Sequence, residues 1–247
     1  MTDSAAPIQD EPPQGDIRTG FHGELDEIHR SVARLSANVT ELIPRAADVL
    51  LDLDLEGAEY VIMGDDEIDA RSIELEERCY ALLALQAPVA KDLREVVSAV
   101  KLIGEIERSA DLCVNICKAA RRIYGHSLDP RVRGVIQKMG DQAQKLFKEA
   151  TEAYLASDAV RAAALDDMDA LLDDLQREFI QIIFECHAAG SIDLQVAVQL
   201  AVVARFFERI GDHAVNIGEK VRYVVHGWTP EHAGAARFEA RTRERMG

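Results

Sequence analysis

One short pattern occurs twice in the chain and constrains the fold more than any other feature. Residues 107–116 and residues 208–217 share Glu, Arg, Asp, Val, Asn and Ile at matching positions. In each copy the Glu, Asp and Asn are spaced four residues apart, which on an α-helix places their side chains along one stripe. Each copy therefore predicts a helix that carries a row of oxygen-bearing side chains.

The repeat extends beyond this pattern to both halves of the chain. Each half is predicted to contain a long helix, a second helix with acidic residues, a break, and a helix that carries the repeated pattern. Asp65 and Asp69 of the first half match Asp169 and Asp173 of the second half with identical spacing. A duplicated unit of this size fits a three-helix bundle in which each helix buries one face against two neighbours. The sequence therefore predicts an all-α fold of two tandem, duplicated three-helix bundles with six long helices.

Proline and glycine positions divide the chain into segments. Residues 1–20 are predicted to form a disordered acidic tail, residues 21–128 the first bundle, residues 129–228 the second bundle and residues 229–247 a charged C-terminal tail. The helices are expected over residues 21–52, 54–85, 89–124, 131–156, 158–188 and 192–225. Pro44 lies inside the first of them. Because an interior proline costs about 3 kcal/mol, a kink or a break is predicted there.

The formal net charge of −16 weighs against several classes of partner. Nucleic-acid binding needs basic patches, and an anionic membrane surface repels an acidic protein. No apolar run approaches the roughly 20 residues that span a bilayer. The four cysteines form no disulfide framework and no signal peptide is recognisable, so a cytoplasmic protein with reduced thiols is expected. Cys113 and Cys117, one helical turn apart, are interpreted as core residues and not as ligands of a soft metal.

Each half offers two pairs of carboxylates spaced four residues apart. Two such helices packed side by side would gather four negative charges, which repel one another. Either a cation or the adjacent Arg108 and Arg209 would have to offset them. Carboxylates favour Mg²⁺, Mn²⁺, Ca²⁺ or iron, whereas a zinc site would need His and Cys. The candidate metal ligands are Asp65, Asp69, Glu107 and Asp111 in the first half and Asp169, Asp173, Glu208 and Asp212 in the second.

Asparagine and histidine side chains lie next to these rows. Asn115 and Asn216 extend the rows by one turn. His213 follows Asp212, but successive helix residues point about 100° apart, so it is predicted to be a surface histidine and not a ligand. The chain lacks the Glu-x-x-His motifs of redox di-iron bundles, and it has no P-loop, nucleophile elbow or zinc-protease motif. No catalytic or cofactor-binding residue is therefore predicted.

The repeated element, with the form Glu-Arg-Ile-Gly-Asp-x-x-x-Asn-Ile, resembles the PhoU family of phosphate-uptake regulators. The Pro-Val-Ala-Lys-Asp-Leu-Arg stretch at residues 88–94 and the duplicated three-helix layout resemble this family as well, and the similarity covers residues 21–227. In the first copy Ser109 and Ala110 stand where the family has Ile and Gly. A glycine there allows a neighbouring helix to approach closely, and alanine is a small substitute.

The resemblance implies a cytoplasmic all-α protein whose Glu/Asp-x-x-x-Asp motifs hold metal ions, including iron clusters in some members. Carried over to this chain, it implies Fe, Mn or Mg ions on the eight carboxylates named above. It also implies an adaptor between the phosphate ABC transporter, through a PstB-like ATPase, and a PhoR-like sensor histidine kinase. We expect a homodimer.

The sequence is compatible with three functions. The leading hypothesis is a non-enzymatic, metal-binding adaptor that negatively regulates phosphate uptake and the phosphate-starvation response. The first alternative is a metal-dependent phosphohydrolase that uses carboxylate-bound metals. The second alternative is a helical scaffold without metal.

Overall fold

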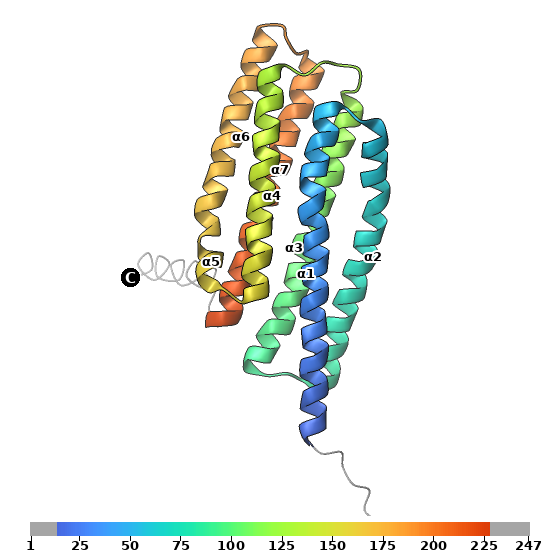
Figure 1. Cartoon of the computed structure of the whole chain (residues 1–247), viewed down its shortest axis with the longest axis vertical. Helices are drawn as coiled ribbons and strands as arrows, with labels where there is room; N and C mark the ends of the chain where they lie inside the picture. Colours follow the sequence, from blue (N-terminus) through green and yellow to red (C-terminus); the bar gives the residue numbers. More distant parts are fainter. Residues whose placement is uncertain (1–13, 228–247) are drawn as a thin grey trace, which may run out of the picture.

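The computed structural model describes residues 14–227, and all of its regular structure within that range is helical. Its elements are α1 (Gln14–Asp52), α2 (Leu55–Gln86), α3 (Ala90–Arg122), α4 (Pro130–Ala156), α5 (Ala159–Ala163), α6 (Leu165–Ala188) and α7 (Leu194–His226). Figure 1 shows two three-helix bundles side by side, one made of α1, α2 and α3 and the other of α4, α6 and α7, with short α5 leading into α6. The predicted all-α, duplicated architecture is confirmed.

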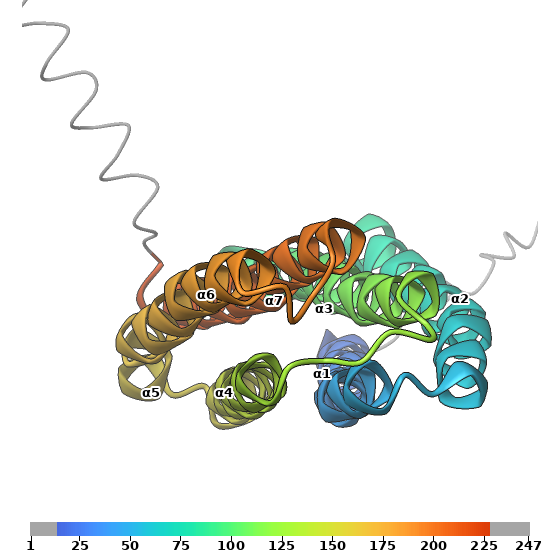
Figure 2. The same ribbon diagram turned by 90° about the horizontal axis from the view of Figure 1, so that it is seen from above.

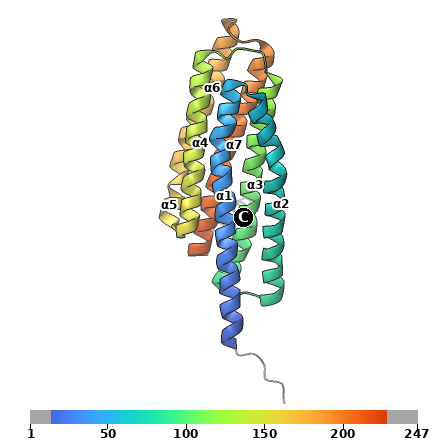
Figure 3. The ribbon, with the colours of Figure 1, turned by 45° about the vertical axis from the view of Figure 1, so that its right-hand side comes forward.

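The two bundles pack against each other through two pairs of helices. Helix α1 lies beside α4, and α3 lies beside α7. In the view from above, α3 and α7 form one layer and α1 and α4 form the other (Figure 2), and the same neighbours run along each other in Figure 3. Gly140 of α4 permits a close contact with α1, because a Cβ atom there would lie 2.8 Å from the Cβ of Ala47. The buried side chains of both halves consequently form one hydrophobic cluster.

Aspartates cap the starts of four helices. Asp54 accepts a hydrogen bond from the backbone N–H two residues ahead, and Asp158 accepts from the N–H groups two and three residues ahead, all at 3.0 Å. Asp193 caps α7 in the same way. Such caps satisfy amides that have no partner inside the helix. Asp54 and Asp158, which occupy matching positions in the repeat, therefore serve the fold and not the acidic rows.

Three details of the helices differ from the sequence prediction. The helix α1 begins at Gln14, so residues 14–20 of the predicted tail are helical, while residues 1–13 and 228–247 lie outside the described residues. The same helix continues through Pro44 without a break. Ile43 and Ala46 on either side of the proline are fully buried, and tertiary packing of this kind outweighs an unfavourable local preference. The predicted fifth helix is divided at Ala164 into α5 and α6.

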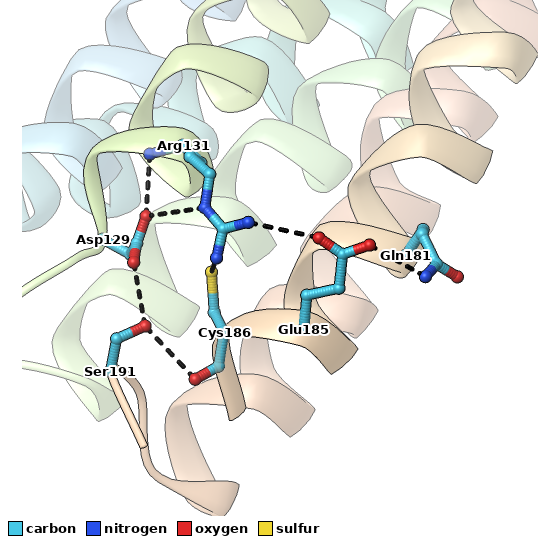
Figure 4. A network of polar contacts seen from close by, with 6 residues as sticks. All are labelled: Asp129, Arg131, Gln181, Glu185, Cys186 and Ser191. Atoms are coloured by element: carbon cyan, nitrogen blue, oxygen red, sulfur yellow. Dashed lines mark hydrogen bonds and ion pairs between the residues drawn. The ribbon is translucent and has the colours of Figure 1, made fainter. Parts of the chain in front are cut away.

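A polar network fastens the start of α4 to the turn between α6 and α7 (Figure 4). Asp129 accepts hydrogen bonds from the backbone N–H of Arg131 at 2.9 Å and from the hydroxyl of Ser191 at 2.8 Å. The Arg131 guanidinium donates to Glu185 at 3.1 Å and lies 3.1 Å from the sulfur of buried Cys186. The connection between the two bundles is thereby tied to the second bundle.

No helix between residues 14 and 227 is both long and apolar enough to cross a membrane.

Candidate metal centres

The first candidate centre lies where α2 packs against α3. Asp65 and Asp69 project from α2, and Glu107 and Asp111 project from α3. Burial raises the pKa of Asp65 to about 6, helped by the negative charges of Asp69 and Asp111. Burial also raises the pKa of Glu107, again with help from Asp111 and Asp69. Because carboxylates of one helix act on those of the other, the four side chains share one acidic surface, as the sequence predicts.

Access to this centre is open on one side. A pocket of about 310 Å³ lies between α2 and α3, and Asp69 and Glu107 belong to its wall. Its other lining residues include Ser72, Gly104 and Arg108. An ion or a water molecule can therefore reach the carboxylates from solvent.

The second candidate centre repeats this arrangement between α6 and α7. Burial raises the pKa of Asp169 to about 6, with the charges of Asp173 and Asp212 as the next causes. Burial also raises the pKa of Glu208, followed by the charge of Asp212. The structure thus brings the four predicted residues of the second half together on one surface as well.

Three carboxylate oxygens in these centres are buried and have no hydrogen-bond partner. They are Oδ1 of Asp65, Oδ1 of Asp169 and Oε2 of Glu208. A buried polar atom without a partner costs about 1–3 kcal/mol, and such atoms are few in native proteins. A hard cation takes several oxygen ligands at once, so it is a group that would satisfy these atoms.

The carboxylates are not drawn tightly around a point. Within residues 14–227, no three His, Cys, Asp or Glu side chains converge closely enough to form a ready-made metal cluster. The donor chemistry nevertheless fits a hard ion, because Mg²⁺ keeps several of its waters and uses few protein carboxylates. Side-chain rotation would have to complete a site with more ligands.

The sequence left Arg108 and Arg209 as the alternative to a cation, and their charges oppose the rise in the pKa of Glu107 and Glu208 without forming an ion pair with either. Arg108 pairs with Glu105 at 2.9 Å and not with Glu107. Arg205, and not the predicted Arg209, pairs with Glu208. Among the ion pairs of the described residues, this last one alone reaches any of the eight candidate ligands.

Gly211 allows α7 to approach α6 closely at the second centre. A Cβ atom at this position would lie 2.3 Å from Oδ1 of Asp169 and 2.8 Å from Cδ2 of Leu172, which is far inside van der Waals contact. The expected reason for a glycine here is thereby confirmed. The first half has buried Ala110 at the matching position, so α2 and α3 leave room for a methyl group.

The predicted surface position of His213 is wrong. This residue is only 7 % exposed, and its Nδ1 lies 2.7 Å from Oε2 of Glu105 on α3. Asn216 donates to the same oxygen at 3.1 Å, so it is engaged across the interface between the halves. Burial alone would raise the pKa of Glu105, but the hydrogen bonds from His213 and Asn216 and the charge of Arg108 hold it at about 2.

Sequence reasoning missed Glu105. Its one signal is that this glutamate precedes the first copy of the repeated pattern, whereas Phe206 stands at the matching position before the second copy. The interpretation of Cys113 and Cys117 as core residues is confirmed, because both are fully buried and burial raises the pKa of both thiols.

Two fused three-helix bundles, each with a facing set of carboxylates, define a duplicated all-helical protein with paired acidic centres. A family model described as the PhoU domain matches residues 32–120 and again residues 136–221. The chain belongs to the PhoU family of accessory and regulatory proteins of phosphate transport systems. This is a family of regulatory proteins and not of enzymes.

Individual relatives agree along nearly the whole length. The chain is 34 % identical over 215 residues to the phosphate-specific transport system accessory protein PhoU homolog 2 of Mycobacterium tuberculosis, covering 87 % of this chain and 100 % of that protein. It is 29 % identical over 235 residues to the PhoU homolog of Pseudomonas aeruginosa, covering 94 % and 96 %.

Two crystal structures have the same fold. The phosphate transport system regulatory protein PhoU from Streptococcus pneumoniae superposes with a TM-score of 0.78 at 25 % identity, covering 85 % of this chain and 98 % of that one. PhoU from Pseudomonas aeruginosa gives a TM-score of 0.79 at 28 % identity, covering 84 % and 100 %.

Proposed function

We propose that this chain restrains phosphate uptake and the phosphate-starvation response as a metal-binding adaptor. Its proposed partners are a PstB-like ATPase of the phosphate ABC transporter and a PhoR-like sensor histidine kinase. Membership of a family of transport accessory proteins supports the regulatory part of this proposal. The two acidic centres support the metal-binding part.

The observation that carries the metal-binding part is the pair of buried, unpartnered oxygens at matching positions, Oδ1 of Asp65 and Oδ1 of Asp169. A single orphaned oxygen could be incidental, but the same one recurs in both copies of the repeat. The eight carboxylates would hold Fe, Mn or Mg ions, which favour oxygen ligands. A bound cation would cancel part of the local negative charge and so change the potential that each bundle presents to a partner.

A scaffold without metal is the second candidate function, and the lack of a converged three-residue cluster between residues 14 and 227 favours it. Purification without chelator, followed by elemental analysis, separates the two candidates. If the chain binds metal, we expect the purified protein to contain Fe, Mn or Mg. We also expect its melting temperature to rise when Mn²⁺ is added, because a ligand that binds only the native state stabilises it. A purified protein that contains no metal, and whose melting temperature does not change when Mn²⁺ is added, would favour the scaffold without metal.

The regulatory part is tested by deleting the gene and measuring a phosphate-starvation reporter in high phosphate. We expect reporter expression to rise in the deletion strain, because the restraint is lost, and to fall again when the wild-type gene is restored. Expression that stays as low as in the parent strain would remove the regulatory assignment.

A further inference from the structure

A polar cluster joins the two halves at the seam between α3 and α7, and we call Glu105, His213 and Asn216 the seam clamp. One oxygen of Glu105 lies 2.7 Å from Nδ1 of His213 and 3.1 Å from Nδ2 of Asn216. The other oxygen accepts from Arg108 at 2.9 Å. The side chains of Glu105 and His213 are 13 % and 9 % exposed, so the clamp is largely withdrawn from water.

The seam clamp has no counterpart on the other side of the seam. The repeat places Phe206 where the first half has Glu105, and Leu112 where the second half has His213. Both of these residues belong to the hydrophobic cluster or pack against it. Apolar contacts let packed helices slide by small amounts, whereas hydrogen bonds demand a defined distance and angle. The clamp therefore fixes the position of α3 along α7.

The clamp also lies next to both acidic centres. Glu105 precedes Glu107 by two residues on α3, while His213 follows Asp212 directly on α7 and Asn216 lies one turn beyond Asp212. At about 100° per residue, Glu105 is turned away from Glu107 on α3 and His213 is turned away from Asp212 on α7, so these two side chains meet across the seam. Asn216 lies on the same stripe as Asp212, and its amide also donates to Glu105. Helices α3 and α7 are thus walls of the two centres and partners in the clamp at the same time.

We propose that the seam clamp couples the two centres, so that a cation bound at one raises the affinity of the other. This inference rests on the proposed metal-binding function. A cation bound by carboxylates of both α2 and α3 restricts the motion of α3. Because the clamp fixes α7 to α3, the motion of α7 is restricted as well. The second cation then loses less conformational freedom on binding, which is positive cooperativity without a change of fold. Glu105 is in this sense a positioning residue and not a ligand.

The test measures Mn²⁺ affinity at the second centre, with and without a working first centre. Free Mn²⁺ is followed by electron paramagnetic resonance in about 0.3 M salt, where charges further apart than a few ångströms are screened. The first centre is disabled with Asp65→Asn and Asp69→Asn. We expect this to weaken the second centre about fivefold in the otherwise natural chain, at the lower end of usual coupling.

The same comparison is then made in a Glu105→Leu chain, which completes a double-mutant cycle. Here we expect disabling the first centre to change the second by less than about twofold. Glu105→Gln keeps an oxygen acceptor and should preserve most of the coupling. Phe206→Leu, at the matching apolar position, is the control and should preserve all of it. A clamp with a purely structural role would lower the melting temperature in Glu105→Leu but leave the fivefold ratio in place.

The outcomes separate the two proposals. An equal ratio in the Glu105→Leu chain and the natural chain would overturn the coupling while leaving the metal centres intact. A natural chain that binds no Mn²⁺ would overturn the metal-binding function and the coupling with it. Should Glu105→Leu fail to fold by circular dichroism, Asn216→Ala removes one of the two partners that Glu105 has across the seam, and an undiminished ratio there would equally overturn the coupling.

Discussion

The two acidic centres carry matching carboxylates but differ in what offsets their charge. In the first centre the charge of Lys118 opposes the rise in the pKa of Asp65 that burial and the neighbouring carboxylates cause, whereas the second half has Glu219 at the position of that lysine. In the second centre Arg205 pairs with Glu208, whereas the first half has Gly104 at the position of that arginine. Each centre therefore has one cationic side chain at a position where the other half has none, in addition to Arg108 and Arg209, which occupy matching positions beside Glu107 and Glu208. The carboxylate rows and these two arginines are common to both copies, whereas Lys118 and Arg205 are not.

The centres also differ in the space left for a side chain at one matching position. The side chains of Asp169 and Leu172 on α6 fill the space that a methyl group at Gly211 would need, whereas the first half buries the methyl group of Ala110 at the matching position. The same carboxylate rows are therefore compatible with two different side-chain packings at this position. We therefore expect the second centre to tolerate a larger side chain at position 211 less well than the first centre tolerates a change at position 110.

The largest expected effect comes from removing both carboxylates that one helix contributes to a centre. Glu208→Ala with Asp212→Ala should weaken Mn²⁺ binding at the second centre by about 100-fold or more, equivalent to about 2.8 kcal/mol. Glu107→Ala with Asp111→Ala is the matched change in the first half and should affect the first centre in the same way. Isothermal titration measures both affinities, and circular dichroism should show unchanged helix content. Two variants that bind Mn²⁺ as the natural chain does would remove these residues as ligands.

A methyl group at position 211 should break the second centre selectively. Gly211→Ala places a Cβ atom against Asp169 and Leu172, and overpacking of this kind destabilises by about 1–3 kcal/mol. Displacement of Asp169 should also weaken Mn²⁺ binding at the second centre.

The matched control for that change is Ala110→Gly in the first half. It should cost only about 0.5–1 kcal/mol through helix propensity and leave Mn²⁺ binding unchanged. Urea denaturation gives the stabilities. If Gly211→Ala and Ala110→Gly weaken Mn²⁺ binding at their respective centres equally, the difference in packing at this position does not affect metal binding.

Removing the compensating cations should strengthen binding modestly. Lys118→Gln should raise Mn²⁺ affinity at the first centre by about two- to fivefold, and Arg205→Gln should do the same at the second, because exposed charge pairs contribute about 0.2–1 kcal/mol. Both gains should shrink in high salt. A gain at the opposite centre in either variant would show that the charges are assigned to the wrong sites.

The smallest expected effect is on the pH dependence of stability without metal. The folded pKa of Asp65 and of Asp169 is raised to about 6, so between their ordinary value and about 6 the native state binds more protons than the unfolded state. Unfolding free energy from these groups therefore falls as pH rises through that window. The double change Asp65→Asn and Asp169→Asn removes this penalty.

The double variant should consequently melt higher relative to the natural chain at pH 7 than at pH 5. Thermal scans in chelator at the two pH values measure the difference. A difference that is constant with pH would mean that the two carboxyls titrate normally in the folded protein.

Helical periodicity predicted the parts of the structure that depend on one helix at a time. The spacing of four residues predicted that Glu107 and Asp111 share one helix face, and that Glu208 and Asp212 do so too. The repeated layout predicted that the neighbouring helices present Asp65 and Asp169 to these faces. The division at Ala164 could not be predicted, because the surrounding alanines and leucine are good helix formers and offer no stop signal. The unbroken helix at Pro44 depends on burial by other helices, which periodicity does not report.

The seam clamp could not be predicted from helical periodicity either, for a related reason. Glu105 meets His213 and Asn216 across two halves of the chain, and the contact depends on how one bundle docks on the other. The row interpretation assigned Asn216 to the metal stripe because it considered α7 alone. Its amide is instead directed to α3, so the repeat predicts what the halves share and not what joins them.

We propose that the facing carboxylates of each bundle bind a cation, and crystals grown with Mn²⁺ test this proposal most directly. Anomalous diffraction at the manganese absorption edge should show a peak between α2 and α3 and another between α6 and α7, each coordinated by oxygens of the predicted aspartates and glutamates. Diffraction without a peak at either position, at Mn²⁺ concentrations that saturate ordinary carboxylate sites, would contradict the account.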